Sequence, residues 1–473
     1  FGNTIKADNA STISVTGGAD IAATVSGAAA STISFDVGSG TIAVGSTAIS
    51  TFSLANSGSV QITSAVRLSG VSTLTIDTQS DADLSNVNTT GLSTLQISGG
   101  AALSQASFGF HSGGSTDLTI SLTGLAAGFS AAEINLLSAS MVLSGTNATG
   151  AITVSGITAS GATVSLGTIQ NFTTGAVKLT DSFTLDGAAS TSSSNSASIN
   201  IAGITASSGA TLAFGAGTGL ISAGGIHSDG AVTVDASNFS GSLQLPSISG
   251  SGITVSLGTN GMVSSATIDS TKAVTLDGSI ASSSDITMGV VAASTNLTLS
   301  LGSGTGGLSI GTQASAGGLL VIDASKSGGS LDVFAMTASG ATVSLGTSGD
   351  FSAGAIQTQA GGFTLDGANS TSAQISITTI TASAAATISM GSGSGAVQVS
   401  GLAAVGAVTI DASSYAGTMD VNQISASGIS IVAGPRGDFS AQTIMSSKNF
   451  VFDASVATSA EVALTGISVS GTV

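Results

Sequence analysis

The sequence predicts an all-β protein built as a parallel β-helix, or β-solenoid, with about 22 residues per coil and about 21–22 coils. Three observations predict this fold. Short apolar segments recur at a nearly constant spacing along the whole chain. Apolar and polar residues alternate within each segment, which is typical of a strand with one buried face. The chain is also rich in small and β-branched residues, with 66 Gly and only two Pro, and such residues suit strands and tight corners.

A central apolar residue marks each predicted strand, and we call these residues anchors. Successive anchors are 19–23 residues apart, except for one interval of 27 residues between Leu185 and Leu212. The extra residues of that interval, 188–198, are expected to form a loop outside the regular stack. The anchors are Val15, Phe35, Leu54, Ile76, Ile97, Ile120, Leu143, Val164, Leu185, Leu212, Val234, Val255, Leu276, Leu299, Ile322, Val343, Leu365, Ile388, Ile410, Ile431, Phe452 and Val473.

A longer repeat divides the chain into two parts of one solenoid. The motif TVSLGT begins at Thr163, Thr254 and Thr342, and a degenerate copy begins at Ser430. Residues 144–473 therefore form the C-terminal part, with superrepeats of 88–91 residues that each contain four coils. Residues 1–143 form the N-terminal part, which has coils of the STxSx type. Single coils cannot bury their apolar faces, so stacking of coils is expected to create the core.

The residue after each anchor is expected to face outward and alternates between Asp and uncharged residues. Asp side chains at strand ends accept hydrogen bonds from nearby backbone at corners, and alternation separates carboxylates that would repel one another in adjacent coils. Weak binding of divalent cations along this column is the alternative interpretation. Thr usually precedes the anchor, either as an ordinary solvent-facing strand residue or as part of an ice-binding face. The column reads Ser165, Asp186, Ala213, Asp235, Ser256, Asp277, Ser300, Asp323, Ser344, Asp366, Ser389, Asp411, Val432, Asp453.

The densest acidic cluster is a candidate metal site. Asp77, Asp81 and Asp83 in TIDTQSDADL could supply several oxygen ligands to one Ca²⁺. The segment is not an EF-hand loop, because the required glycine and bidentate Glu are missing. No other cofactor is predicted.

Charge and composition argue against several classes of function. The net charge of −17 opposes nucleic-acid binding, and no run approaches the roughly 18 apolar residues of a membrane-spanning helix. His111 and His227 are the only histidines, and Cys is absent, so neither a His-paired nucleophile nor a zinc site is indicated. Glycoside hydrolysis needs two placed carboxylates, whereas the repeat disperses the acids. We therefore predict that the protein is not an enzyme and has no catalytic residues.

Several phrases resemble known repeats. GAVTVDASNFSGSLQL, GAVTIDASSYAGTMDV and GVSTLTIDTQS are similar in style to the β-solenoid repeats of bacterial S-layer proteins and type I-secreted surface proteins. The resemblance extends over the whole chain, although the calcium-binding nonapeptide GGxGxD of the RTX proteins does not occur. It implies an extracellular protein at the bacterial cell surface that self-associates into a lattice, filament or stalk. Ca²⁺ and cell-surface polysaccharide are the further partners that it implies.

These observations predict a structural protein that forms a surface layer, filament or stalk by stacking and lateral association. A secreted adhesin or autotransporter-like passenger is the main alternative, and a carbohydrate-active β-helix enzyme and an ice-binding protein are weaker ones. The chain opens with Phe1 and shows no signal peptide, so we expect a processed protein or a piece of a longer one. Open strand edges at both ends would pair with further chain or with another subunit.

Overall fold

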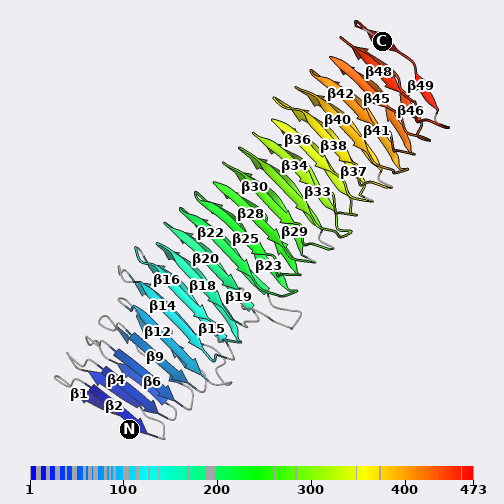
Figure 1. Ribbon diagram of the computed structural model, residues 1–473. Helices are drawn as coiled ribbons and strands as arrows, with labels where there is room; N and C mark the ends of the chain where they lie inside the picture. The colour runs from blue at the N-terminus through cyan, green and yellow to red at the C-terminus, as the bar shows by residue number, and fades with distance from the viewer. Residues whose placement is uncertain are drawn as a thin grey trace. The chain divides into compact units, whose positions relative to one another are not determined.

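The computed structural model describes residues 117–471, apart from residues 126–127, 137, 147, 168–170, 188–197, 260, 283–284, 348, 372–373 and 460. Before residue 117 it describes the backbone of short strands, and side chains only at residues 14, 73–76 and 92–98. The regular elements of the described residues are strands, without a helix, and accordingly none of them forms a helix that could cross a membrane. Figure 1 shows the strands stacked side by side within each part of the chain.

The chain divides into two compact units, residues 1–244 and residues 245–473. Each unit is a parallel β-solenoid, and the described residues make about 15 turns of about 22 residues each, so the predicted fold is confirmed. The predicted division of the solenoid after residue 143, where the repeat style changes, lies within the first unit. It stays a prediction from the sequence. The predicted loop at 188–198 lies outside the described residues except for Ser198, where a strand begins.

Within each unit, every coil contributes a short strand to a parallel sheet, which we call the anchor sheet. In the first unit its strands are β2 (Thr12–Gly17), β4 (Thr32–Val37), β6 (Thr51–Asn56), β9 (Thr73–Thr78), β12 (Thr94–Gly99), β14 (Leu118–Thr123), β16 (Met141–Gly145), β18 (Ala162–Leu166), β20 (Ser182–Gly187), β22 (Gly209–Phe214) and β25 (Ala231–Ala236). In the second unit they are β28 (Gly252–Leu257), β30 (Val274–Gly278), β32 (Leu297–Leu301), β34 (Leu319–Asp323), β36 (Gly340–Ser344), β38 (Phe363–Gly367), β40 (Ala386–Met390), β42 (Ala407–Asp411), β45 (Gly428–Val432) and β48 (Phe450–Asp453).

Within each unit, the remaining length of the coils forms a second parallel sheet, the long-strand sheet, in which some strands are broken in two. In the first unit it comprises β1 (Gly2–Lys6), β3 (Ala22–Ser26), β5 (Gly40–Val44), β7 (Val60–Gln61), β10 (Ala82–Leu84), β13 (Ala106–Ser112), β15 (Gly128–Leu136), β17 (Ala151–Ala159), β19 (Asn171–Leu179), β21 (Ser198–Ala206), β23 (Leu220–Ala223), β24 (Ile226–Ser228) and β26 (Ser242–Gln244), and β8 (Val66–Arg67) pairs separately with β11 (Val87–Asn88).

In the second unit the long-strand sheet follows the same plan. Its strands are β27 (Ser247–Gly250), β29 (Met262–Ser270), β31 (Ile286–Ala293), β33 (Leu308–Ala316), β35 (Leu331–Ala338), β37 (Phe351–Thr358), β39 (Ile375–Ala382), β41 (Ala396–Ala404), β43 (Thr418–Val421), β44 (Gln423–Ala426), β46 (Phe439–Ala441), β47 (Thr443–Ser446), β49 (Val462–Leu464) and β50 (Ile467–Val469).

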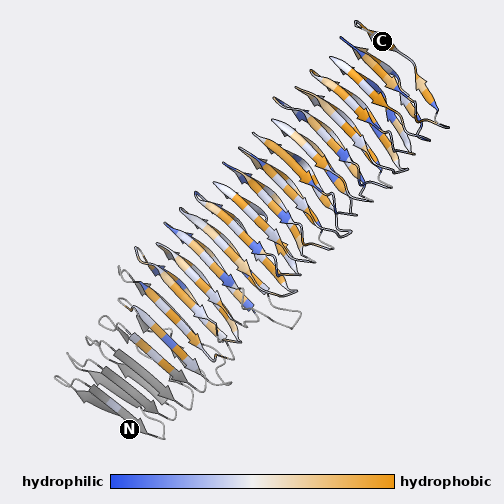
Figure 2. Ribbon diagram, viewed as in Figure 1, coloured by the Kyte–Doolittle hydropathy of each residue, from blue (hydrophilic) through white to orange (hydrophobic). Residues whose placement is uncertain are grey.

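The anchors stack on one another inside each unit, as the sequence predicts. In the first unit Val164 pairs with Leu185 and Leu185 with Leu212. In the second unit an unbroken register runs from Val255 through Leu276 to Phe452. Figure 2 shows hydrophobic and hydrophilic residues alternating along the strands. Because these anchors lie in register, the core within each unit is a column of stacked side chains. Each buried aliphatic side chain stabilises the fold by about 1.5–3 kcal/mol.

Candidate functional site

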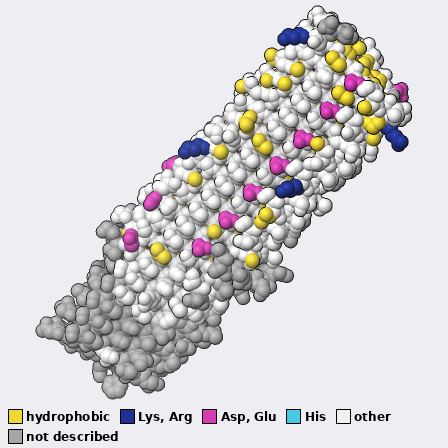
Figure 3. Space-filling model, in the orientation of Figure 1, with side chains coloured by type: hydrophobic (Ala, Val, Ile, Leu, Met, Phe, Trp, Pro, Cys, Tyr) yellow, Lys and Arg dark blue, Asp and Glu magenta, His cyan; other side chains and the backbone are white. Residues whose placement is uncertain are grey.

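The outer surface of the anchor sheet carries a regular column of carboxylates. In the second unit the residues after the anchors lie in register: Ser256 pairs with Asp277, and Asp277 pairs with Ser300. Figure 3 shows acidic side chains in a row along this face. Because strands are about 4.8 Å apart, successive carboxylates two coils apart are separated by about 10 Å. The predicted alternation is confirmed, and we call this column of the second unit the acidic ladder: Asp277, Asp323, Asp366, Asp411 and Asp453.

Each ladder carboxylate also closes a turn, as the sequence interpretation proposed. Its Oδ1 accepts a hydrogen bond from the backbone N–H two residues later, and the distance is 3.0 Å for Asp323 and Ser325. The N–H of the fourth residue after the Asp then donates to the carbonyl of the first, as Ser327 does to Ala324 at 2.8 Å. We call this five-residue segment the acidic turn. The Oδ1 bonds of the other four turns measure 2.8–3.0 Å: Asp277–Ser279, Asp366–Ala368, Asp411–Ser413 and Asp453–Ser455.

Hydrogen bonding also changes the acidity of one ladder residue. The pKa of Asp453 lies below its ordinary value of 3.8, first because the backbone N–H of Ser455 donates to the carboxylate and second because the Ser455 side chain also hydrogen-bonds to it. The charged form of this carboxylate is therefore the one that the turn stabilises.

The alternation of Asp-bearing coils and uncharged coils has a steric cause in addition to charge repulsion between the carboxylates. The coil after each acidic turn carries glycine three residues beyond its anchor, at Gly302, Gly346, Gly391 and Gly434. A Cβ at Gly346 would collide with the backbone carbonyl of Ser327, and one at Gly434 with that of Tyr415. Backbone atoms cannot move aside cheaply, so the acidic turn requires glycine in the next coil.

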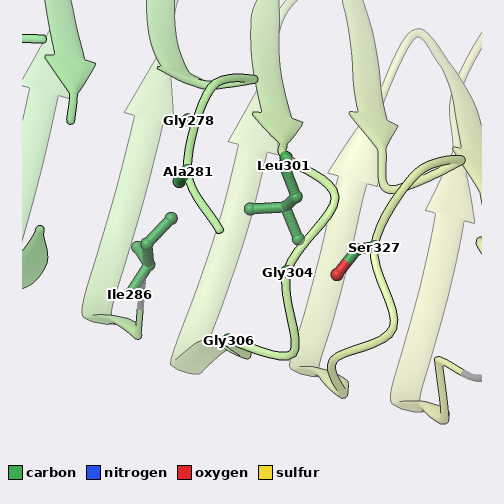
Figure 4. Close-up of a pocket in the computed structure, with 8 residues that line it drawn as sticks. Gly278, Ala281, Ile286, Leu301, Gly304, Gly306 and Ser327 are labelled. Carbon is green, nitrogen blue, oxygen red and sulfur yellow. The ribbon is translucent and has the colours of Figure 1, made fainter. Parts of the chain in front are cut away.

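The fourth residue after the Asp points into the corner between coils. Its side chain differs in size from one acidic turn to another. At Tyr415 the side chain is 2% exposed, and its hydroxyl donates to the Gly395 carbonyl at 2.7 Å. Burial raises the pKa of Tyr415 to about 12. At the equivalent positions of other coils stand Ala281 and Ser327, and a small hollow with room for about one water molecule lies between them. Figure 4 shows this hollow with Ile286 and Leu301 on its walls. The hollow is not predicted from the sequence.

A second set of acidic residues connects neighbouring coils, and this role was not predicted from the sequence. Asp285, Asp350 and Asp438 precede strands of the long-strand sheet. Each Oδ1 accepts a hydrogen bond from a backbone N–H one coil later, at Gly307 (3.1 Å), Gln374 (2.8 Å) and Glu461 (2.8 Å). These carboxylates hold the coil corners together. An Asp directly before a long strand was the sequence signal that could have identified them.

The predicted calcium site is only partly described. Asp77 lies in β9 of the anchor sheet, where its backbone pairs with that of Ser98. Asp83 lies in β10 of the long-strand sheet. Their side chains and the whole of Asp81 lie outside the described residues, so this site stays a prediction. Where the structure does describe side chains, no three His, Cys, Asp or Glu residues are grouped to hold a metal ion.

Comparison with known proteins identifies no relative. No protein-family model, curated protein or solved structure matches the chain. The resemblance to S-layer and type I-secreted proteins therefore remains one of repeat style. The acidic ladder is the surface feature of the second unit from which a function is argued below.

Proposed function

We propose that the protein is a structural element of a bacterial cell surface, outside the cell, and that its copies associate into a layer, filament or stalk. The acidic ladder is the observation that carries this proposal. Its carboxylates are fixed by backbone hydrogen bonds and recur every two coils. A surface that repeats one chemical group at a constant spacing suits contact with another regular surface, including that of a second copy. The repeat style of S-layer proteins supports the same role.

The proposed association of copies involves Ca²⁺. Copies with a net charge of −17 repel one another, so close lateral packing of acidic faces requires cations. Carboxylate oxygens are ligands that Ca²⁺ prefers. In each acidic turn Oδ1 is engaged by the backbone, which leaves Oδ2 outside that hydrogen bond. We therefore propose that Ca²⁺ promotes association without a closed, high-affinity site.

We also propose that the protein is not an enzyme. The spacing of the ladder supports this, since its carboxylates are about 10 Å apart along the stack. Paired carboxylates of glycosidases are about 5–5.5 Å apart in retaining enzymes and about 6.5–9.5 Å apart in inverting ones. The sequence also offers few basic and aromatic residues to bind an acidic polysaccharide.

Sedimentation and negative-stain imaging with Ca²⁺ or with a chelator test the proposal. We expect ordered assemblies with Ca²⁺ and dispersal on chelation. The triple substitution Asp277→Asn, Asp323→Asn and Asp366→Asn keeps an oxygen acceptor in each turn and should weaken assembly. The matched control removes three acids off the ladder, as Asp269→Asn, Asp332→Asn and Asp420→Asn, and should assemble nearly as the unsubstituted protein does.

A chain that stays monomeric at millimolar Ca²⁺ and high protein concentration would refute the proposal. On intact cells an ordered lattice or fibre supports it. Isolated projections would instead indicate an adhesin stalk.

A further inference from the structure

The two edges of the anchor sheet in the second unit carry opposite charge. The edge where the anchor strands begin holds two exposed lysines, Lys272 and Lys448, and its described corners from residue 270 to residue 449 contain no acidic residue. We call it the lysine edge. The edge where these strands end holds the acidic ladder (Figure 3) and the three Asp residues that bridge coil corners, with Lys326 and Arg436 as its basic residues. The lysine edge of one copy therefore complements the acidic edge of another.

The two lysines have the same spacing as the ends of the acidic ladder. Lys272 and Asp277 belong to one coil, and Lys448 and Asp453 belong to another. Within both the lysine pair and the Asp pair, the two residues are 176 positions apart. Eight strand pairings in register separate these coils, which corresponds to about 38 Å along the stack. Two copies that lie side by side at the same level would bring both lysines of one copy to the first and last ladder carboxylates of the other.

Exposed apolar side chains extend this match. The third residue after the Asp of each acidic turn lies on the acidic edge. It is Ile280 in the coil of Lys272 and Val456 in the coil of Lys448, and these two residues are 55% and 46% exposed. In side-by-side packing, the aliphatic stem of each lysine would cover this apolar side chain while the ammonium group reaches the carboxylate.

The coils between them fit the same arrangement. Leu319 lies on the lysine edge and is 56% exposed, and the acidic turn of its coil carries Lys326 at the third position. Here the aliphatic stem of a lysine on the acidic edge would meet Leu319 of the neighbouring copy. In the next Asp-bearing coil both positions hold exposed amides, Gln359 and Asn369, which can hydrogen-bond to each other. A lysine thus faces an aliphatic side chain in three of the five ladder coils, and none of the five sets lysine against lysine.

We infer that copies of the protein pack side by side, with the lysine edge of one copy against the acidic ladder of the next. This inference rests on the self-association proposed above and names the contact that forms it. The two edges are different surfaces, so the contact is heterologous and extends a row of copies unless rotation closes a ring. Asp366 and Asp411 meet no lysine in this contact, which leaves them for Ca²⁺. The corresponding corners of the first unit hold Asp181 and Asp229 instead of lysine.

Removing the lysine charges tests the contact. Lys272→Gln combined with Lys448→Gln should lower the association constant about tenfold, as expected for the loss of two exposed ion pairs, when measured by sedimentation equilibrium with Ca²⁺. Gln357→Glu combined with Gln398→Glu is the matched control. It changes the net charge by the same amount at exposed positions of β37 and β41 and should associate nearly as the parent does. Equal association constants for the two double variants would overturn the inference.

Charge exchange between two further variants is the decisive experiment. Lys272→Glu combined with Lys448→Glu reverses the lysine edge and should associate about 100-fold more weakly, because like charges then face each other. Ile280→Lys combined with Val456→Lys adds lysines to the acidic edge while every acidic turn keeps its Asp, and it should also associate more weakly. Lys326 already occupies this turn position, so the second variant is expected to fold, and its thermal midpoint verifies this.

Mixing these two variants should restore association. In an equimolar mixture, each contact between unlike variants joins opposite charges again, so rows should form in which the variants alternate. A mixture that associates no better than its separate components would overturn the inference. If the parent assembles with Ca²⁺ and the variant with the reversed lysine edge assembles equally well, the inference fails and the proposed function stands. A parent that never assembles would overturn both.

Discussion

The acidic turns after Asp411 and Asp323 have the same backbone and differ in one side chain. In both, Oδ1 accepts from the N–H two residues later at 3.0 Å, and the N–H of the fourth residue donates to the carbonyl of the first at 2.8 Å. One turn places Tyr415 into the corner and the other places Ser327 there. The turn is therefore specified by Asp and by the glycine of the next coil, and the fourth residue is free to fill the corner or to leave it open.

The largest effect is expected from converting the filled corner into an open one. Tyr415→Ser removes a buried ring and its hydrogen bond to Gly395, and it should lower the free energy of unfolding by about 4 kcal/mol, in the range of Phe-to-Ala changes in cores. Urea denaturation measures this quantity. Tyr415→Phe removes only the hydroxyl and should cost about 1 kcal/mol. Equal losses for both variants would show that the ring itself contributes little.

The next effect tests the glycine that follows each of these turns in the next coil. Gly346→Ala would drive a methyl group into the carbonyl of Ser327 and should cost about 3 kcal/mol. Gly252→Ala is the matched control, because its Cβ would meet nothing nearer than the Ala273 carbonyl oxygen at 3.9 Å. If Gly346→Ala unfolded at the same urea concentration as the control, the steric origin of the alternation would be wrong.

A smaller effect is expected from the carboxylate of the turn. Asp323→Ala removes the acceptor of the Ser325 N–H and should cost about 1 kcal/mol, comparable to the loss of a helix N-cap. Asp332→Ala removes the same charge from an exposed strand position of β35, and it should shift the thermal midpoint much less. A larger shift for the control would mean that net charge and not the turn dominates.

The smallest effect is a pH dependence at Asp453. Its pKa in the folded protein lies below the ordinary 3.8 because of the Ser455 hydrogen bonds, so its stabilisation is present above pH 3.8 and is lost as the pH falls through the lower, folded value. The stability difference between the parent and Asp453→Asn should be constant above pH 3.8 and change only below it. A difference that begins to change near neutral pH would contradict this assignment.

The sequence predicts the fold and the acidic ladder but not the hollow. Anchors such as Val255 and Leu276 reveal themselves by spacing alone, because a strand's buried face repeats every second residue and each coil repeats about every 22. Asp323 and Asp366 follow from the same register. The corner at Ser327 could not be predicted, since its neighbours Leu301 and Gly304 come from the previous coil and meet it only through the path of the turn. The metal site predicted at Asp77, Asp81 and Asp83 stays untested.

The dependence of each acidic turn on glycine in the following coil limits how such a chain can lengthen or shorten. In Asp-bearing coils the position three residues after the anchor holds Ser325 or Ala368 instead of glycine. Deleting a single coil would set two Asp-bearing coils together, with carboxylates about 4.8 Å apart and a methyl or hydroxymethyl group where the turn leaves no room. Gene duplication or recombination that adds or removes coils in pairs, about 44 residues at a time, preserves the pattern, so the natural increment of length is two coils and not one.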